Sequence, residues 1–311
     1  MSTIKNYLSL VKFSHTIFAL PFALIGFFLA TLRNPLYVIA GQWNLNSTIG
    51  WGGDRSNFVW WKSIGIKFIL VLVCMVTARS AAMAFNRYLD RHFDEKNPRT
   101  AIREIPKGII SADSALQFTI ACCLLFVITT YLINPVCFFL SPIALFVILF
   151  YSYTKRFTAL CHLVLGLGLS LAPIGAYLAV TGRFDVLPVL FSFAVIFWVS
   201  GFDIIYALQD IEFDRSQQLH SIPAALGKKN ALHVSELLHL LSAACVIAAG
   251  VYGHFHWIYW LGITVFAGML IYQHSIVKPD DLRKVNLAFM TANGIASVVF
   301  AVLVISDLLI Y

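Results

Sequence analysis

Residues 84–100 read AFNRYLDRHFDEKNPRT, and residues 203–215 read DIIYALQDIEFDR. In both stretches polar side chains with oxygen atoms recur every four residues: Asn86, Asp90 and Asp94 in the first, and Asp210 and Asp214 in the second. Residues four apart share one face of a helix, where like charges repel unless a cation lies between them. Mg²⁺ prefers oxygen ligands and commonly links one or two carboxylates to phosphate oxygens. Two such acidic helix ends, facing each other, therefore predict a Mg²⁺ site that binds a diphosphate.

The composition indicates a protein that lies in a membrane. Of 311 residues, 59% are hydrophobic and 12% are charged, whereas about 25% of residues are charged in a soluble domain. A helix needs about 20 apolar residues to cross about 30 Å of hydrocarbon. The segments that qualify are 15–33, 63–85, 115–133, 135–151, 161–180, 186–206, 233–251, 255–275 and 287–306. We therefore predict an all-α polytopic membrane protein, with about nine transmembrane helices in a bundle around a central cavity.

The positions of the basic residues predict the orientation of this bundle. If the N-terminus is cytoplasmic, most of the 22 Lys and Arg residues fall on the cytoplasmic side, together with both acidic stretches. The positive-inside rule favours that arrangement. It predicts an integral inner-membrane protein whose N-terminus, cavity opening and acidic site all face the cytoplasm. The net charge of +7 then follows from topology and from anionic lipid headgroups, so we expect no nucleic-acid partner and no obligate protein partner.

The two acidic stretches share one layout, in which an acidic helix end is followed by a basic segment and then by the start of another helix. This duplication suggests one domain, residues 1–311, made of two pseudo-equivalent halves at about 1–151 and 152–311. Internal repeats of this kind place the binding site of a membrane protein at the interface between the halves. We therefore expect the two acidic stretches to meet around one cavity.

Other classes of function find less support in the sequence. It contains no GxxxxGK[ST] phosphate loop, no GxGxxG that opens a helix after a strand and no GxSxG. A transporter that moves cations or protons through intramembrane acids is the alternative from a different class. Such a protein would place its acids near the bilayer midplane on broken helices. Here the acids lie at helix ends in paired form, which favours phosphate chemistry.

With both motifs in place, the chain resembles the UbiA superfamily of intramembrane prenyltransferases. It matches the NxxxDxxxD motif of that family at Asn86, Asp90 and Asp94, and the YAxxDxxxD motif at Tyr206, Ala207, Asp210 and Asp214. The likeness covers nearly the whole chain and includes KFSHTIFALPFA at 12–23, NPRTAIREIP at 97–106 and YSYTKRFT at 151–158. The first of these segments and ARSAAMAFNR at 78–87 are most similar to the branch of 4-hydroxybenzoate polyprenyltransferases.

The resemblance implies a Mg²⁺-dependent enzyme that transfers a polyprenyl group from a polyprenyl diphosphate to an aromatic acid. The new bond forms at the ring carbon beside the phenolic hydroxyl, and 4-hydroxybenzoate, used in ubiquinone biosynthesis, is the expected acceptor. A naphthoate on the menaquinone route or a porphyrin-type ring stays open as the acceptor. By the same resemblance, the residues that hold the metal ions are Asn86, Asp90 and Asp94 on one side, and Asp210 and Asp214 on the other.

Basic residues near the acidic stretches are candidates for binding the substrates. Arg offers a planar fork to phosphate oxygens, and the candidates on the predicted cytoplasmic face are Arg87, Arg99, Arg103, Lys155 and Arg156. Arg79 differs, because it falls inside the second predicted span, where a lone cation needs an anionic partner. That partner is either the substrate or Asp203 in a structural bridge. For the acceptor carboxylate the candidates are Lys12 and His15, unless Lys12 reaches to the headgroups and His15 packs in the bundle.

Four side chains are predicted to act in catalysis. Asp203 and Tyr206 precede Asp210 by seven and four residues, so all three share one helix face. An acid beside the reacting cation would stabilise positive charge or accept the ring proton. Tyr151 and Lys155 are the other two, because the segment YSYTK that contains them matches the pattern of the family.

Overall fold

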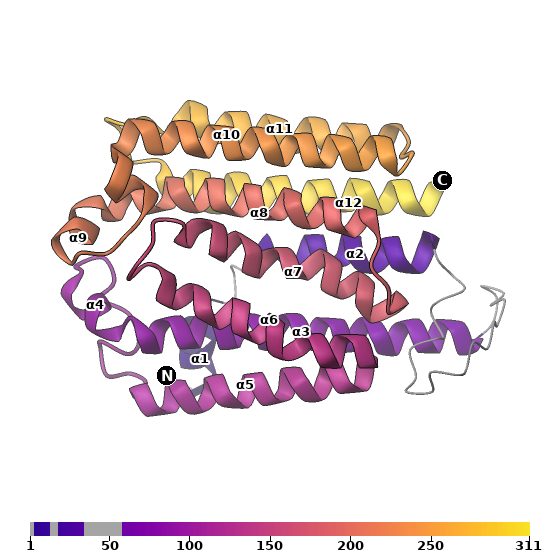
Figure 1. The fold of residues 1–311 in the computed structure, drawn as a ribbon, viewed down its shortest axis with the longest axis horizontal. Helices are drawn as coiled ribbons and strands as arrows, with labels where there is room; N and C mark the ends of the chain where they lie inside the picture. Colours follow the sequence, from indigo (N-terminus) through magenta and orange to yellow (C-terminus); the bar gives the residue numbers. More distant parts are fainter. Residues whose placement is uncertain (1–2, 13–17, 34–57) are drawn as a thin grey trace.

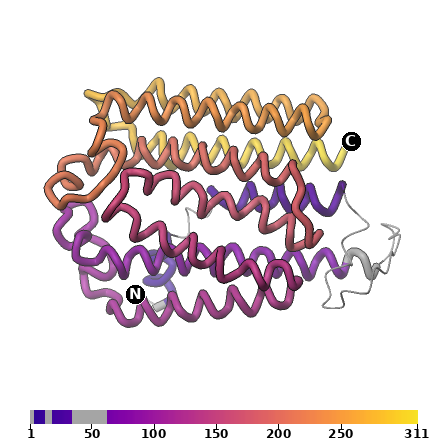
Figure 2. Tube along the Cα trace, in the orientation of Figure 1, coloured from indigo at the N-terminus to yellow at the C-terminus, as the bar shows by residue number. Residues whose placement is uncertain are grey.

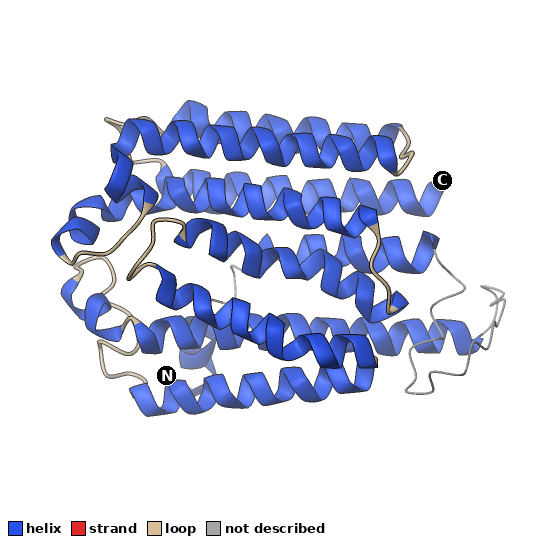
Figure 3. Ribbon diagram, in the orientation of Figure 1, coloured by secondary structure: helices blue, strands red, loops and turns tan. Residues whose placement is uncertain are grey.

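The structure of the protein is a computed structural model that describes residues 3–12, 18–33 and 58–311, with side chains from residue 62 onward in the last range. These residues form helices and no β-strand (Figure 3). The long helices lie side by side in one bundle (Figure 1, Figure 2). In chain order the elements are α1 (Thr3–Leu10), α2 (Leu20–Arg33), α3 (Phe58–Leu89), α4 (Arg91–Lys96), α5 (Ala112–Ile133), α6 (Pro135–Thr154), α7 (Cys161–Thr181), α8 (Val186–Ala207), the 3₁₀ turn η3 (Leu208–Asp210), α9 (Ile211–Ser216), α10 (Ile222–Tyr252), α11 (Trp257–Ile276), the π-helix η4 (Leu287–Ala292) and α12 (Asn293–Ile310).

Every predicted span coincides with a helix of the bundle, the last one with η4 and α12 together. Among the described residues, seven helices are long and apolar enough to cross a membrane. The two others that match predicted spans are α2, which has 14 residues, and α11, whose Trp, Tyr, Gln and His residues lower its mean hydropathy. The all-α membrane fold is confirmed, and the count of nine crossings stays a prediction.

A predicted break separates α5 from α6. Asn134 has extended backbone angles, and its side-chain Oδ1 accepts a hydrogen bond from Cys137 N at 2.8 Å. Pro135 follows as the first residue of α6, where its missing N–H costs no helical hydrogen bond. The Asn134 amide also donates to the carbonyl of Leu178 at 2.8 Å. One residue therefore ends α5, caps α6 and ties both to the end of α7.

The core of the bundle forms around α8, which packs against α7 and α10. Its Trp198 is fully buried, with ring centroids 5.3 Å from Phe22 of α2 and 6.0 Å from Phe266 of α11. α2 approaches α7 so closely that a Cβ atom on Gly26 would lie 2.0 Å from the carbonyl oxygen of Pro173. Only glycine leaves room for that contact, which holds α2 against α7.

Both acidic stretches lie where a long helix breaks. α3 ends at Leu89, and the six-residue α4 begins at Arg91. α8 ends at Ala207 and is followed by η3 and by α9, which also has six residues. Figure 1 shows α4 and α9 at the same end of the bundle. This repeated local layout supports the proposal of two equivalent halves, 1–151 and 152–311.

Candidate active site

A cavity of about 290 Å³ lies at the end of the bundle that carries α4 and α9. Predicted metal ligands, catalytic residues and substrate-binding residues all contribute to its wall. They are Asn86, Asp90, Asp94, Asp210 and Asp214, then Asp203, Tyr206, Tyr151 and Lys155, and finally Arg79, Arg87, Arg99, Arg103 and Arg156. The fold therefore brings together residues that are far apart in the sequence, and their individual roles stay predictions.

Of the predicted site residues, Lys12 is the one described residue that does not line the cavity. Lys12 lies in the turn after α1 and is exposed. His15 lies outside the described residues. An exposed Lys beside a membrane can extend its charged end to the lipid headgroups. The geometry thus favours the structural alternative for Lys12 over contact with the acceptor carboxylate.

The first acidic motif runs from the end of α3 into α4. The amide of Asp90 donates to the Asn86 carbonyl and that of Asp94 to the Asp90 carbonyl, at 2.9 and 2.8 Å, so helical spacing continues across the break. The Asn86 side chain donates from Nδ2 to Asp90 Oδ2 at 3.0 Å. Arg156 Nη2 donates to Asp90 Oδ1 at 2.9 Å, and Arg103 Nη1 donates to Asp94 Oδ1 at 2.5 Å. Arg156 and Arg103 thus pair with Asp90 and Asp94, the two acids that were predicted to share one helix face.

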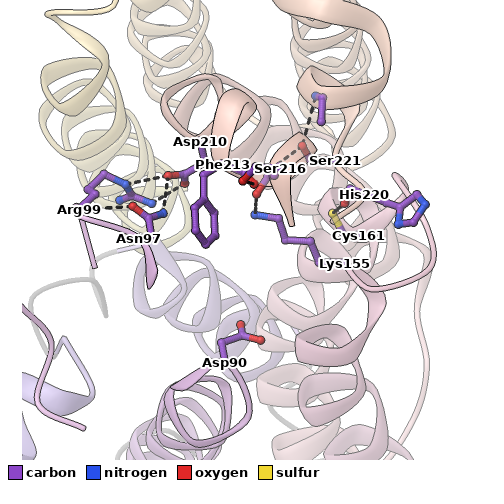
Figure 4. A network of polar contacts seen from close by, with 12 residues as sticks. Asp90, Asn97, Arg99, Lys155, Cys161, Asp210, Phe213, Ser216, His220 and Ser221 are labelled. Atoms are coloured by element: carbon purple, nitrogen blue, oxygen red, sulfur yellow. Dashed lines mark hydrogen bonds and ion pairs between the residues drawn. The ribbon is translucent and has the colours of Figure 1, made fainter. Parts of the chain in front are cut away.

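The second acidic motif, which follows α8, is paired in the same way (Figure 4). The Arg99 guanidinium binds both oxygens of Asp210, with Nε 3.0 Å from Oδ1 and Nη2 in contact with Oδ2. Asp214 is fully buried and accepts a hydrogen bond from Ser221 Oγ at 2.8 Å. The Lys155 ammonium lies 2.7 Å from Asp214 Oδ1. Charge-assisted contacts of this kind, and bidentate Arg–carboxylate pairs above all, are the strong polar interactions of proteins.

The two motifs face one another. Figure 4 shows Asp90 opposite the cluster around Asp210 and Lys155, with the ring of Phe213 pointing toward it. The side chain of Asp90 is 26% exposed, and the other three motif aspartates are at most 8% exposed as residues. Uncompensated charges at this depth would be expensive. The pairing of every motif aspartate with at least one Lys or Arg explains how four carboxylates can share one cavity.

The surroundings shift the protonation of several of these groups. Burial raises the pKa of Asp90 to about 6, although the nearby Arg156 opposes the shift. Burial lowers the pKa of Lys155, but Asp214 outweighs it, so the pKa lies above its usual value. Burial also lowers the pKa of Arg99, but the contacts with Asp210 outweigh it, so this pKa too lies above its usual value. The two cations therefore stay charged, whereas Asp90 would gain from a further cation near its carboxylate.

The donor set fits Mg²⁺ that is shared with a substrate. In the described part of the chain, no three His, Cys, Asp or Glu side chains converge into a ready-made metal cluster. Mg²⁺ is usually held by one or two carboxylates together with waters and substrate phosphates, so it needs no such cluster. Asp94 Oδ2 is buried and accepts no hydrogen bond from the described residues, although Arg87 Nη1 lies 3.9 Å away. An acceptor atom without a partner at the cavity wall is where a cation would be stabilised.

Asp203 does not pair with Arg79, so the predicted structural bridge is absent from the described residues. Instead, Asp203 Oδ2 lies 2.7 Å from Nδ1 of His162, a residue at the start of α7 that was not predicted. A single histidine in the apolar stretch LCHLVLG, 160–166, forms no pattern, so only the fold relates it to the site. Arg79 Nε is buried and makes no hydrogen bond with the described residues. Arg79 therefore has an unused donor at the cavity wall.

The remaining part of the wall is apolar and aromatic. Its residues include Phe18, Met83, Leu165, Leu169, Val199, Phe202 and Phe289. The ring of Tyr206 stacks on Phe289 with centroids 4.3 Å apart, and its hydroxyl accepts a hydrogen bond from Arg99 Nη1 at 2.9 Å. Phe289 belongs to η4, and π-helical turns often occur at functional sites. The cavity thus joins a charged end that suits a polyanion to an apolar wall that suits hydrocarbon or an aromatic ring.

Known proteins of similar sequence are named as prenyltransferases. A 4-hydroxybenzoate octaprenyltransferase from Tolumonas auensis is 29% identical over 247 residues, which cover 78% of this chain and 86% of that protein. A 4-hydroxybenzoate octaprenyltransferase from Francisella tularensis subsp. mediasiatica is 27% identical over 237 residues, which cover 76% of this chain and 83% of that protein.

Solved structures with the same fold include two archaeal proteins. A UbiA homolog from Aeropyrum pernix K1, in its apo form, has a TM-score of 0.73 and 29% identity, covering 95% of this chain and 97% of that one. A UbiA homolog from Archaeoglobus fulgidus bound to DMAPP and Mg²⁺ has a TM-score of 0.69 and 19% identity, covering 98% and 100%. The model of the UbiA prenyltransferase family matches residues 19–295. The chain therefore belongs to the UbiA prenyltransferase family.

Proposed function

We propose that the protein transfers a polyprenyl group from a polyprenyl diphosphate to the ring carbon beside the hydroxyl of 4-hydroxybenzoate, in ubiquinone biosynthesis. The observation that carries the proposal is the cavity in which four carboxylate–cation pairs adjoin an apolar, aromatic wall. Its charged end suits the diphosphate, and its apolar part suits the prenyl group and the ring. The names of the relatives from Tolumonas and Francisella support this acceptor.

Both acidic motifs would take part in binding the diphosphate. Asn86, Asp90 and Asp94 would hold one Mg²⁺, and Asp210 and Asp214 another. Bound Mg²⁺ would supply positive charge that offsets the charge of the leaving diphosphate. The homologs from Archaeoglobus fulgidus bound to DMAPP or GPP together with Mg²⁺ support the choice of metal and of a prenyl diphosphate as substrate.

The basic residues that pair with the motif acids would bind the phosphate oxygens. Arg99, Arg103 and Arg156 offer guanidinium forks, and Lys155 offers an ammonium group. Each already lies within contact distance of a motif carboxylate, so a change of partner from carboxylate to phosphate requires only a side-chain movement. Cations held in a site with little water stabilise developing negative charge strongly. They would therefore lower the barrier to breaking the C–O bond of the diphosphate ester.

The transfer itself needs groups that tolerate a carbocation and remove a proton. When the C–O bond breaks, its electron pair leaves with the diphosphate, and the acceptor ring attacks the allylic cation that remains. The stacked rings of Tyr206 and Phe289 lie at the cavity wall, where aromatic faces attract positive charge. Asp203 would accept the proton that the ring loses when it becomes aromatic again. Tyr151, which lines the same cavity as Asp203 and Asp90, would orient the acceptor hydroxyl.

We infer that Arg79 binds the carboxylate of the acceptor. Its guanidinium is buried in α3 at the cavity wall and has an unused Nε–H. A buried donor without a partner costs about 1–3 kcal/mol, so a carboxylate of the right reach would be bound there in preference to a neutral group. Lys12, an earlier candidate for this contact, is exposed outside the cavity wall.

We further propose that the protein lies in the inner membrane with this cavity on the cytoplasmic side. Apart from Arg79, which falls inside a predicted span, the basic residues that line the cavity come from the same segments that the positive-inside rule assigns to the cytoplasm. The aromatic acid would then enter from the cytosol, and the prenyl chain would remain among lipids. Reporter fusions at the C-terminus, which we expect to lie outside, test this orientation.

The experiment that tests the function uses purified protein, Mg²⁺ and a polyprenyl diphosphate. The acceptors offered are 4-hydroxybenzoate, a hydroxynaphthoate and a porphyrin-type ring, and each product is identified by mass spectrometry and NMR. We expect prenylation of 4-hydroxybenzoate beside its hydroxyl. If the naphthoate or the porphyrin gives product and 4-hydroxybenzoate gives none, the proposed acceptor is wrong, whereas the proposed diphosphate site is unaffected.

A further inference from the structure

His162 stands directly behind the carboxylate that would remove the ring proton. It is 2% exposed, and its Nδ1 lies 2.7 Å from Asp203 Oδ2. The Asp203 side chain is 24% exposed and lines the cavity. Asp203 Oδ1 makes no hydrogen bond with the described residues. One oxygen of the carboxylate is thus tied to a buried imidazole, and the other remains available to a ligand.

The other contacts of His162 define which ring nitrogen carries the proton. The backbone N–H of Ile222 lies 3.4 Å from Nε2 and can only donate, so Nε2 accepts. Nδ1 therefore carries the hydrogen and donates it to Asp203. The N–H of Nδ1 donates to Asp203 Oδ2 and so holds this carboxylate in one orientation.

The same contacts join Asp203 to the second acidic motif. Ile222 is the first residue of α10 and follows Ser221, whose Oγ donates to Asp214 Oδ2 at 2.8 Å. Ser200 Oγ also donates to the His162 carbonyl at 3.0 Å, which fixes the first turn of α7 against α8. The imidazole is therefore held between Asp203 and the start of α10.

We propose that His162 is a positioning residue that orients Asp203 so that its Oδ1 faces the acceptor ring. The inference rests on the proposed function. After the new C–C bond forms, the attacked ring carbon carries both the prenyl group and a hydrogen. The C–H bond then breaks, its electron pair returns to the ring, and the proton moves to Asp203 Oδ1. His162 keeps its own proton on Nδ1 throughout and acts through Asp203, although the residue also contributes to the cavity wall.

A purely structural role for His162 is the competing explanation, since the residue also links α7 to α8 and α10. The two explanations differ in the step that they affect. A positioning role slows removal of the ring proton, whereas a structural role lowers the amount of folded enzyme or weakens substrate binding. Acceptor deuterated at both ring carbons beside the hydroxyl separates these cases, because only a slowed C–H cleavage increases the kinetic isotope effect.

The test compares His162→Phe, His162→Asn and Ser170→Ala with the wild type. Phe fills similar space without a hydrogen bond, and Asn retains an N–H donor close to the position of Nδ1. Ser170→Ala is the matched control, because this buried hydroxyl of α7 donates to the Leu167 carbonyl and does not line the cavity. General-base catalysis contributes about 10²–10⁴-fold, so we expect His162→Phe to lower kcat about 10²-fold while KM for the diphosphate is unchanged. The isotope effect should exceed that of the wild type, and His162→Asn should restore both values in part.

An Asp203→Asn variant completes the test and serves if His162→Phe does not fold. Adding His162→Asn to Asp203→Asn should cause no further loss of kcat, because His162 acts only through Asp203. An unchanged isotope effect in the His162 variants, or a fully additive loss in the double variant, would overturn the inference. Wild-type protein that forms no prenylated 4-hydroxybenzoate would instead overturn the proposed function, which the same assay reports separately.

Discussion

Replacing Asp214 by Asn should nearly abolish prenyl transfer, because it removes one charge and changes little else. Asp214 is 0% exposed, accepts a hydrogen bond from Ser221 at 2.8 Å and lies 2.7 Å from the Lys155 ammonium. The Asn side chain can still accept from Ser221, but it can neither balance Lys155 nor hold Mg²⁺ as a carboxylate does. Removing one group that stabilises charge in a transition state costs about 10²–10³-fold in kcat, and we expect at least that loss.

The cost of the same substitution to stability should be moderate. Breaking a fully buried ion pair costs about 3–5 kcal/mol. The Lys155 side chain is 34% exposed, so water compensates part of its charge, and we expect a loss of about 1–3 kcal/mol. The thermal unfolding midpoint, measured in the detergent of the kinetic assay, separates this loss from the effect on turnover.

The assay measures initial rates of product formation over a range of Mg²⁺ concentrations with both substrates saturating. Asp214→Asn should require more Mg²⁺ for half-maximal rate and should not reach wild-type turnover at any concentration. Glu212→Gln is the matched control, since Glu212 is exposed on the same short helix and does not line the cavity. Surface changes alter energies by about 0.5 kcal/mol at most, so its rate should stay within about twofold. A folded Asp214→Asn variant with wild-type rate and Mg²⁺ dependence would refute the reasoning.

Three other predictions concern the metal, the acceptor and the core. Chelation of divalent metal should remove activity and added Mg²⁺ should restore it; activity in excess chelator would point to a diphosphate site built from Arg and Lys alone. Arg79→Gln should raise KM for 4-hydroxybenzoate about 10–150-fold, the equivalent of about 1.5–3 kcal/mol for a charged hydrogen bond, with little change for the diphosphate. Lys12→Met is the comparison variant and should leave KM for 4-hydroxybenzoate unchanged. A raised KM in Lys12→Met together with an unchanged KM in Arg79→Gln would indicate that Lys12 binds the carboxylate. Gly26→Ala should lower the thermal unfolding midpoint, because its Cβ would lie 2.0 Å from the Pro173 carbonyl oxygen. Gly175→Ala is the control and should not lower it, because a Cβ there meets no atom within 4 Å. Equal midpoints for the two variants would argue against close packing of α2 on α7.

Much of the fold could be predicted because its main determinants are local. Apolar segments of about 20 residues form helices in a bilayer, where each backbone group must be satisfied within its own segment. The Asn134–Pro135 break was the least certain boundary of the prediction, and the structure has it there, because Pro135 cannot donate to the preceding turn. α2 was predicted as 15–33 and begins at Leu20 among the described residues. Its position depends on Gly26 and Pro173, a contact between distant segments that no local pattern encodes.

The candidate site could be predicted where it repeats a spacing and could not where it depends on single residues. The four-residue spacing located Asp90, Asp94, Asp210 and Asp214, because helix geometry turns spacing into a shared face. Which cation pairs with which acid depends on how α4 and α9 fold against the bundle. Likewise, His162 reaches Asp203 only because α7 packs on α8. Lys12 belongs to KFSHTIFALPFA, a segment that resembles the family, and yet it does not line the cavity.

The measurement that tests the central claim most directly is an experimental structure with a non-hydrolysable polyprenyl thiolodiphosphate and Mg²⁺. The account predicts the diphosphate between the two acidic motifs, with Mg²⁺ about 2.0–2.1 Å from motif oxygens. Arg99, Arg103, Lys155 and Arg156 should then contact phosphate oxygens instead of their present carboxylate partners. A diphosphate bound elsewhere, or bound while all four carboxylates keep those partners and no metal lies between them, would contradict the account.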